Sequence, residues 1–257
     1  MSAQFDTLGF AHLLADAAGD IARRYFRTPV EVDVKPDNSP VSIADREIEQ
    51  ALRARISETF PEHGILGEEM GSSDVGRDYV WVIDPIDGTR AFLAGRPTFT
   101  TLISLCFQGT PILGIIDQPI LKERYAGAVG QVTLMNKKPI LGRACARLNK
   151  ASFATTSPAY FGSDTRSRYE GLRDACADTI YGGDAYNYAQ LAAGHIDIVA
   201  EAGLKPYDVM ALRPVIEGAG GSISTWAGAP ITLSDYQTVV AAGNAGLHAD
   251  ALSVVSI

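Results

Sequence analysis

The chain has 257 residues, which allows a large hydrophobic core organised as one large domain or as two smaller ones. Hydrophobic residues make up 46% of the sequence and charged residues 20%, as in folded globular proteins, and the net charge of −8 argues against nucleic acid or an acidic membrane as the main partner. The 3 cysteines include no close pair, so they indicate neither a disulfide framework nor a thiolate zinc site.

Helix and strand signals alternate in the first half of the chain. Apolar residues at helical spacing predict a helix over residues 4–26, and Pro29 ends the pattern. Ser42 is a suitable N-cap for a second helix, which ends before Pro61. Segments rich in β-branched and aromatic residues, separated by glycine and proline, predict strands over residues 64–66, 79–84, 98–107 and 112–117.

The same alternation continues in the second half of the chain. Strands are predicted over residues 151–156, 196–200, 222–226 and 238–243, and helices over residues 166–177, 186–194, 206–220 and 244–255. The sequence shows no internal repeat, low-complexity segment or long linker. If the chain has a domain boundary, we expect it near residues 130–150.

The N-terminus reads MSAQFDTLGFAHLL. It lacks the basic start and the apolar run that a secretory signal requires. No apolar stretch of 18 residues follows, so we expect a cytoplasmic protein with no membrane partner.

The stretch Trp81–Phe92, WVIDPIDGTRAF, places two carboxylates around a proline at the end of an apolar run. Asp84 ends that run and Asp87 stands three residues later, at a position where open α/β structures usually bind their ligands. Gly88 and Thr89 then resemble the start of a helix. The stretch is either a turn whose acidic side chains have no binding role or a site that holds a doubly charged group.

Further acidic residues occur in similar settings elsewhere in the chain. Glu68 and Glu69 follow a short apolar run, and Asp45 and Asp208 each occupy the first turn of a predicted helix. Carboxylate oxygens from scattered segments suit hard cations such as Mg²⁺, and this set is large enough for two neighbouring ions. No zinc site is indicated, because the histidines are isolated from one another: His12, His63, His195 and His248.

Each of these signals also has a simple structural explanation. An acidic residue in the first turn of a helix is favoured by the helix dipole, which accounts for Asp45 or Asp208 taken alone. Adjacent glutamates are common in solvated loops, and Asp84-Pro85 is a turn signal. Lone histidines are mostly surface or packing residues. The order of the segments and their local sequence, taken together, favour a functional site.

That order resembles the inositol monophosphatase superfamily of lithium-sensitive, Mg²⁺-dependent phosphomonoesterases. Five segments carry the resemblance: Lys35 to Asp45, GEE at 67–69, DPIDGT at 84–89, the region of Glu201, and PYDVMAL at 206–212. The resemblance implies one unit over residues 1–257 with a layered αβαβα sandwich, the fold type of inositol monophosphatase and fructose-1,6-bisphosphatase. An α+β half would span about residues 1–140 and an α/β half about residues 141–257. Members are commonly homodimers.

The resemblance also implies a role for each matching residue. A first metal ion would be held by Glu68, Asp84 and the backbone carbonyl of Ile86, a second by Asp84, Asp87 and Asp208, and a weaker third through water by Asp45. The ions would be two to three Mg²⁺, with Mn²⁺ as the alternative. Gly88 and Thr89 would bind the phosphate through backbone N–H groups, while Thr89 and Glu68 orient the attacking water. The sequence departs from the family at Tyr207, where many members have tryptophan.

Three residues bear on the choice of phosphate ester. DGTRAF, with Arg90, resembles the histidinol-phosphate phosphatase branch, whereas inositol enzymes usually continue with Thr/Ser-Asn-Phe. Asp184 stands where inositol enzymes usually have a small uncharged residue, so it would pair with the ammonium group of histidinol. Glu201 would accept from the imidazole or bind the amine. The structural alternatives are a helix N-cap for Asp184 and a surface or dimer-interface position for Arg90.

We therefore expect hydrolysis of L-histidinol phosphate for histidine biosynthesis. The alternatives are an inositol-1-phosphate phosphatase and a broad sugar-phosphate phosphatase. Nucleotide-directed members and fructose bisphosphatases are typically longer. A non-catalytic binder of polyol phosphate or metal would be expected to have lost at least one ligand position, and none is lost here.

Overall fold

The computed structural model describes residues 6–34 and 40–256. Lys35, at the start of the first segment that carries the family resemblance, lies outside the described residues, as do the first two residues of the helix predicted over 4–26. The helices are α1 (Thr7–Tyr25), α2 (Ile43–Thr59), α3 (Thr89–Leu93), α4 (Ser163–Ala175), α5 (Tyr186–Ala192), α6 (Pro206–Val209), α7 (Leu212–Gly218) and α8 (Ala245–Val255), with 3₁₀ turns at η1 (Leu148–Lys150) and η2 (Pro158–Tyr160).

The strands form a small ribbon and two larger sheets. The ribbon pairs β1 (Val32–Val34) with β2 (Pro40–Ser42). The eight-stranded sheet has the order β10 (Lys138–Pro139), β9 (Leu134–Met135), β8 (Glu123–Ala128), β7 (Thr110–Gln118), β6 (Thr100–Phe107), β5 (Tyr79–Asp87), β3 (Gly64–Gly67), β4 (Gly71–Ser73). The five-stranded sheet has the order β12 (Asp178–Tyr181), β11 (Ser152–Thr155), β13 (Ile198–Ala202), β15 (Thr238–Ala242), β14 (Ser222–Ser224).

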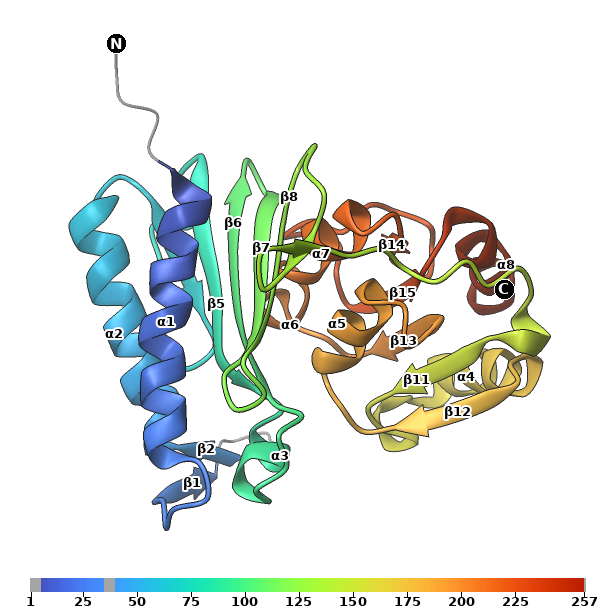
Figure 1. Ribbon diagram of the computed structural model, residues 1–257, viewed down its shortest axis with the longest axis horizontal. Coiled ribbons are helices and arrows are strands. Elements are labelled where there is room, and N and C mark those ends of the chain that lie inside the picture. Colours follow the sequence, from blue (N-terminus) through green and yellow to red (C-terminus); the bar gives the residue numbers. More distant parts are fainter. Residues whose placement is uncertain (1–5, 35–39, 257) are drawn as a thin grey trace.

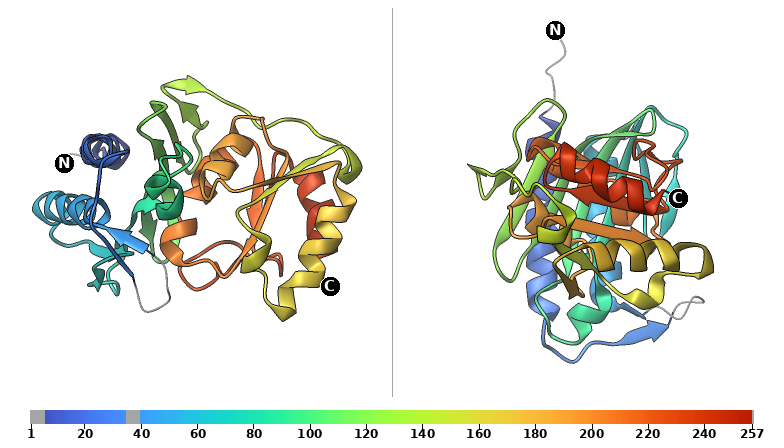
Figure 2. Two further views of the ribbon diagram at one scale, coloured as in Figure 1. Left: turned by 90° about the horizontal axis from the view of Figure 1, so that it is seen from below. Right: turned by 90° about the vertical axis from the view of Figure 1, so that its right-hand side faces the viewer.

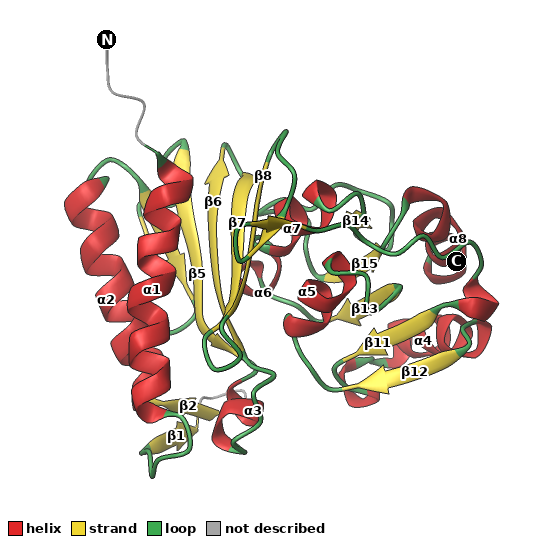
Figure 3. Cartoon of the chain, in the orientation of Figure 1, coloured by secondary structure: helices red, strands yellow, loops and turns green. Residues whose placement is uncertain are grey.

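Helices and sheets alternate in five layers (Figure 1). Helices α1 and α2 cover one face of the eight-stranded sheet, and α5, α6 and α7 lie between its other face and the five-stranded sheet. Helices α4 and α8 form the outer layer on the far side of the smaller sheet, and the same order is visible from below (Figure 2). The secondary-structure colouring in Figure 3 shows the alternation directly. The expected αβαβα sandwich is confirmed.

Helix α1 packs through small side chains. Asp6 is its N-cap, and the Asp6 carboxylate accepts a hydrogen bond of 2.8 Å from the N–H of Gly9. The buried face consists of Ala11, Leu14, Ala15, Ala18, Gly19 and Ala22, whereas Leu13 is 61% exposed. Apolar spacing therefore predicted the helix correctly, but most of its fully buried residues are small, because α1 packs closely against α2 and the sheet.

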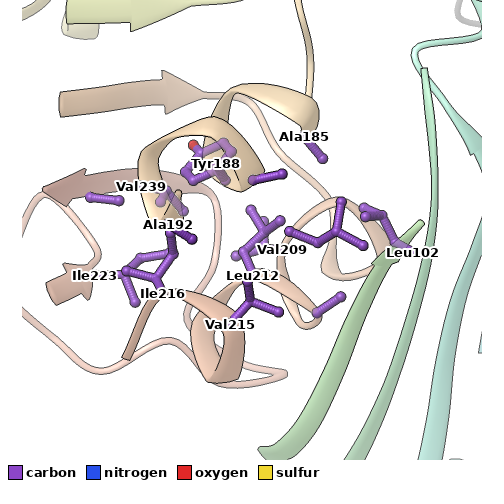
Figure 4. Close-up of a cluster of buried hydrophobic side chains, with 14 of the residues drawn as sticks. Leu102, Ala185, Tyr188, Ala192, Val209, Leu212, Val215, Ile216, Ile223 and Val239 are labelled. Carbon is purple, nitrogen blue, oxygen red and sulfur yellow. The ribbon is translucent and has the colours of Figure 1, made fainter. Parts of the chain in front are cut away.

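A buried cluster in the middle layer joins the two sheets (Figure 4). Leu102 contributes from β6, Tyr188 from α5, Leu212 from α7 and Val239 from β15. Truncating a fully buried Leu, Ile or Met to alanine costs about 2–5 kcal/mol, so a residue such as Leu212 contributes strongly to this contact. The cluster thus fixes the two sheets relative to each other.

The helix predicted over residues 206–220 is two helices, α6 and α7. Pro214 explains the break, because a proline inside a helix lacks the N–H that would bond to the carbonyl four residues earlier. That carbonyl, of Met210, accepts instead a hydrogen bond of 3.2 Å from the hydroxyl of Ser104 on β6. The break therefore ties this segment to the larger sheet.

The strands of the larger sheet end at Pro139, and those of the smaller sheet begin at Ser152. The predicted division of the chain into halves near residue 140 stays a prediction, since α5, α6 and α7 pack on the larger sheet as well. The strands that the sequence did not predict are β1, β2, β4, β8, β9, β10 and β12. Within the described ranges, no helix combines the length and the apolar character needed to cross a bilayer.

Candidate active site

A β-bulge in β5 brings Asp84 and Asp87 to the same side of the strand. Asp84 pairs with Leu102 and Asp87 with Thr100, so β5 has one more residue than β6 between these pairs. Residues three apart face opposite sides of a regular strand, and the extra residue reverses this for the second aspartate. The strand was expected to end at Asp84, but it continues to Asp87 because Pro85 is accommodated at the bulge.

The chain then turns into α3 at Gly88. Gly88 has φ 82° and ψ 41°, in the left-handed region that glycine adopts without strain. A Cβ at Gly88 would lie 2.8 Å from Oδ2 of Asp184, so the two segments approach closely here. The Thr89 hydroxyl donates to the carbonyl of Ile86 at 3.1 Å and lies 3.5 Å from Oδ1 of Asp45.

Asp208 completes a cluster of three carboxylates. One oxygen each of Asp84, Asp87 and Asp208 lie within 4.8 Å of one another. Asp208 comes from α6, and its Oδ2 accepts a hydrogen bond of 2.7 Å from the backbone N–H of Lys205. Asp208 is thus both a first-turn helix residue and a member of the cluster, so its position in the helix does not exclude a metal-binding role.

The cluster has the properties of a metal site. Oδ1 of Asp84 is fully buried and has no hydrogen-bond partner among the described residues. Burial raises the pKa of Asp84 well above its ordinary value, and the charges of Glu68, Asp87 and Asp208 raise it further. The pKa of Asp87 is raised in the same way, first by burial and then by Asp184 and Asp208. A hard divalent cation binds oxygen ligands and would relieve this repulsion, so the donor set fits such an ion.

Asp45 lies behind the cluster. It is fully buried, and its Oδ2 accepts hydrogen bonds of 2.9 Å and 2.6 Å from the backbone N–H and the hydroxyl of Ser42, which caps α2. Burial raises the pKa of Asp45 to about 6 despite the Ser42 hydrogen bonds, and the charge of Glu68 adds to the rise. The first-turn helix position predicted for Asp45 is confirmed, and its other oxygen faces Thr89.

A cavity of about 640 Å³ opens over the cluster. The predicted site residues that line it are Glu68, Asp84, Ile86, Asp87, Gly88, Thr89, Arg90, Asp184, Glu201 and Asp208. Asp45 was also predicted but is not among the lining residues. Tyr160 and Thr156 line the cavity too, and neither was predicted from the sequence, because no motif marks the segment that follows β11.

Asp184 is a substrate-facing candidate, and the N-cap explanation for it is wrong. Ala185 occupies the N-cap position of α5, without a side-chain hydrogen bond. Asp184 has φ 45°, a left-handed conformation that is uncommon outside glycine and directs its carboxylate toward Gly88. Burial raises the pKa of Asp184 to about 6, against the opposing effect of the Arg90 guanidinium.

The segment of Asp184 is tied to the carboxylate cluster. The backbone N–H of Ala185 donates a hydrogen bond of 2.7 Å to Oδ2 of Asp87. One oxygen of Asp87 therefore positions the Asp184 segment, which leaves its other oxygen for a cation. This bond adds a polar connection between the two sides of the cavity to the apolar contacts of the middle layer.

Glu201, on β13, is held by several donors. Its Oε1 accepts a hydrogen bond of 3.0 Å from the backbone N–H of Thr156 and another from the Thr156 hydroxyl, and its Oε2 accepts one of 3.2 Å from Tyr188. Burial raises the pKa of Glu201 to about 7, although the Thr156 hydrogen bonds oppose the rise. Glu201 is thus a structural residue of the cavity wall whose carboxylate also reaches the cavity.

Comparison with known proteins places this geometry among phosphatases. A model of the inositol monophosphatase family matches residues 6–256. The chain is 47% identical over 248 residues to the bifunctional phosphatase IMPL2 of Arabidopsis thaliana, with 93% of this chain and 72% of that protein covered. It is 34% identical over 227 residues to a histidinol-phosphatase of Mycobacterium tuberculosis, with 86% and 87% covered.

The fold is also similar to that of a solved phosphatase structure. A solved structure of an inositol monophosphatase from Zymomonas mobilis superposes with a TM-score of 0.90 at 46% identity and covers 100% of both chains. Histidinol and inositol phosphatases therefore both occur among the relatives. The choice between their substrates depends on the residues that line the cavity.

Proposed function

The chain belongs to the inositol monophosphatase family and is a phosphomonoesterase, and from this premise we propose that it hydrolyses L-histidinol phosphate to L-histidinol and phosphate with Mg²⁺, as a step of histidine biosynthesis. The observation that carries the proposal is the carboxylate of Asp184, which faces the cavity beside Gly88. Histidinol phosphate carries an ammonium group, and inositol phosphate does not.

The metal ions would be held by the cluster of Asp84, Asp87 and Asp208 together with neighbouring groups. Glu68, Asp84 and the carbonyl of Ile86 would bind one ion, and Asp84, Asp87 and Asp208 a second, with Asp45 contributing to a third through water. When bound, Mg²⁺ (or Mn²⁺) lowers the pKa of water and neutralises the charge on the phosphoryl group and the leaving oxygen. The unpartnered Oδ1 of Asp84 supports its assignment to both ions.

Residues of the chain itself orient the reactants. The Thr89 hydroxyl, close to the carbonyl of Ile86, and the carboxylate of Glu68 would position the attacking water for in-line displacement. The backbone N–H groups of Gly88 and Thr89 would hold the phosphate oxygens, because they lie at the start of α3 in a cavity otherwise rich in carboxylates. Catalysis of this type depends on positioning and charge neutralisation more than on covalent chemistry.

The far wall of the cavity would select the substrate. An ammonium group near Asp184 would relieve its repulsion with Asp87 and Glu201, whose pKa values are raised first by burial and further by the charge of Asp184. Arg90 lies close enough to Asp184 to lower its pKa, so the guanidinium favours the ionised form that pairs with the amine. Arg90 therefore belongs to the cavity wall, and its predicted contact with the substrate stays a proposal.

Inositol-1-phosphate is the second candidate substrate. The structural relative from Zymomonas mobilis, an inositol monophosphatase, favours it. A non-catalytic binder is disfavoured because Glu68, Asp84, Asp87 and Asp208 are all retained and all line the cavity. The homodimer and the cytoplasmic location expected from the sequence stay predictions.

The experiment that tests the proposal is phosphate release with Mg²⁺, compared by kcat/KM on histidinol phosphate, inositol-1-phosphate and adenosine 3′,5′-bisphosphate. We expect a preference for histidinol phosphate of about a hundredfold, which corresponds to about 2.7 kcal/mol in transition-state binding. Equal rates on inositol-1-phosphate would refute the substrate assignment and indicate a general phosphatase. No release from any ester would indicate a binding protein.

A further inference from the structure

Glu49, on α2, directs a buried carboxylate at the loop that carries Glu68. The residue is fully buried. Its Oε2 accepts a hydrogen bond of 2.7 Å from the backbone N–H of Glu69, and its Oε1 accepts one of 3.0 Å from the backbone N–H of Met70. These two N–H groups belong to the residues directly after Glu68, so one carboxylate fixes the backbone on that side.

The preceding residue, Gly67, lies directly against the same carboxylate. A Cβ at Gly67 would collide with Oε1 of Glu49, so a larger residue here would displace Glu49 from its two N–H donors. Gly67 is also the last residue of β3, where it pairs with Ile83 of β5. Glu68 is therefore held on both sides, between a strand end and two charge-assisted hydrogen bonds.

Arg53 completes the arrangement one helical turn further along α2. Its Nε donates a hydrogen bond of 2.7 Å to Oε1 of Glu49, and another guanidinium nitrogen donates to the carbonyl of Gly71 at the start of β4. The Glu49 charge is thus neutralised locally, although it lies near an acidic cluster. Glu49 and Arg53 together form hydrogen bonds to both ends of the connection between β3 and β4.

Stability alone is a weak explanation for this pair. Removing two charges from water costs free energy that their attraction often fails to recover, so well-packed apolar side chains would hold α2 on the sheet equally well. Among the described residues, the backbone N–H groups that donate to this carboxylate are those of Glu69 and Met70, directly after Glu68, which lines the cavity. Residues that orient a metal ligand commonly change metal affinity by about 10–100-fold when they are replaced.

We propose that Glu49, supported by Arg53, is a positioning residue that places Glu68 for metal binding. The inference rests on the proposed metal role of Glu68. Glu49 does not touch the reacting atoms, so its effect is on the binding of the ion and not on the chemical step itself.

The test is Glu49→Gln in the full chain, with Glu58→Gln, an exposed position on the same helix, as the matched control. A glutamine has a single acceptor oxygen, and its NH₂ group would face the Arg53 or backbone donors. We expect the Mg²⁺ concentration for half-maximal velocity to rise about tenfold, with a smaller change in kcat at saturating Mg²⁺. Calorimetric titration of the metal-free protein with Mn²⁺ should show the same weakening without any turnover. Glu58→Gln should change neither value.

Three outcomes separate the possibilities. Unchanged Mn²⁺ affinity in Glu49→Gln together with a lower Tm would show a purely structural role and overturn the inference. Glu68→Gln, measured in parallel, reports on the proposed function: if it binds Mn²⁺ normally, the metal role of Glu68 is refuted, and the positioning role with it. If Glu49→Gln does not fold, Arg53→Lys keeps the charge but loses the second contact, and normal Mn²⁺ affinity in that variant would contradict the proposal.

Discussion

The two sides of the cavity hold their functional residues in different ways. On the side of the larger sheet, Asp84 and Asp87 lie on one continuous strand, and Asp45 caps a long helix. On the opposite side, Asp184 follows two glycines with positive φ, at 85° and 112°, and itself has φ 45°. The first side brings its carboxylates together from one bulged strand and a helix start, whereas the second uses a loop with left-handed backbone to direct one carboxylate.

We infer from this difference that the first side binds metal ions and the second recognises the substrate. Ligands on strands and helices are held precisely, which a site for divalent ions requires. A strained loop is where recognition residues are commonly found, and it can change without disturbing the scaffold. We therefore expect substitutions on the sheet side to affect all phosphate esters, and those on the Asp184 side to affect only some of them.

The largest effect is expected for Asp84→Asn, on the sheet side. Asp84 has the unpartnered oxygen and is assigned to both ions, so we expect kcat/KM to fall by about a thousandfold or more on every ester, or about 4 kcal/mol. The metal-free protein should not lose stability, because the substitution removes a buried charge from a repulsive cluster. Phosphate release and thermal unfolding in EDTA measure the two effects. Activity close to that of the wild type would refute the site.

A smaller and selective effect is expected for Asp184→Asn, on the opposite side. Asparagine adopts the left-handed conformation readily and keeps the shape, so mainly the charge is lost. We expect KM for histidinol phosphate to rise about thirtyfold, or about 2 kcal/mol, and KM for inositol-1-phosphate to change less than about threefold. An equal rise in KM for both esters would show that Asp184 supports the loop and does not recognise the amine.

The pH dependence of stability provides a third test. In the metal-free protein, burial raises the pKa of Asp208 and of Glu201 to about 7 and that of Asp45 to about 6, above their values in the unfolded chain. The folded protein therefore binds more protons than the unfolded chain, and its stability falls as the pH rises through these values.

We expect Tm in EDTA to decrease by about 5 °C between pH 5.5 and pH 8, and Mg²⁺ to restore most of it at pH 8, because the ion binds the ionised carboxylates. Differential scanning calorimetry at matched ionic strength measures both changes. A Tm in EDTA that rises between pH 6 and pH 8 would contradict the repulsive cluster.

The smallest effect is expected for Arg90→Gln. The guanidinium lowers the pKa of Asp184, so its loss should leave more of Asp184 protonated near pH 6. We expect the ratio of KM for histidinol phosphate at pH 6 to that at pH 8 to increase about threefold, a difference of less than about 1 kcal/mol. A ratio unchanged from the wild type would place Arg90 outside the recognition of the amine.

The sequence predicted the sheet side of the cavity better than the opposite side. DPIDGT identified Asp84, Asp87 and Gly88, but not the bulge, because the register depends on Thr100 of a strand that pairs later in the chain. Asp184 was identified by its type, but its left-handed backbone could not be inferred from the preceding glycines. Tertiary contacts, rather than local sequence, decide both features.

Glu49 shows a different reason for a missed residue. In the sequence it is one of several charged residues on an amphipathic helix, and Arg53 stands four residues later, as in an ordinary exposed ion pair. Its burial becomes apparent only when the loop between β3 and β4 packs onto α2. Helical spacing predicted α2 well, but it does not distinguish an exposed ion pair from a buried one.

In the proposed mechanism, Asp84 joins two metal sites opposite Asp184, which recognises the amine. Anomalous diffraction from crystals grown with Mn²⁺, phosphate and histidinol tests it most directly. We predict two peaks about 3.5–4 Å apart with a carboxylate oxygen of Asp84 at both, and the amine of histidinol within hydrogen-bond distance of Asp184. Mn²⁺ peaks away from Asp84, or histidinol bound with its amine turned away from Asp184, would contradict the account.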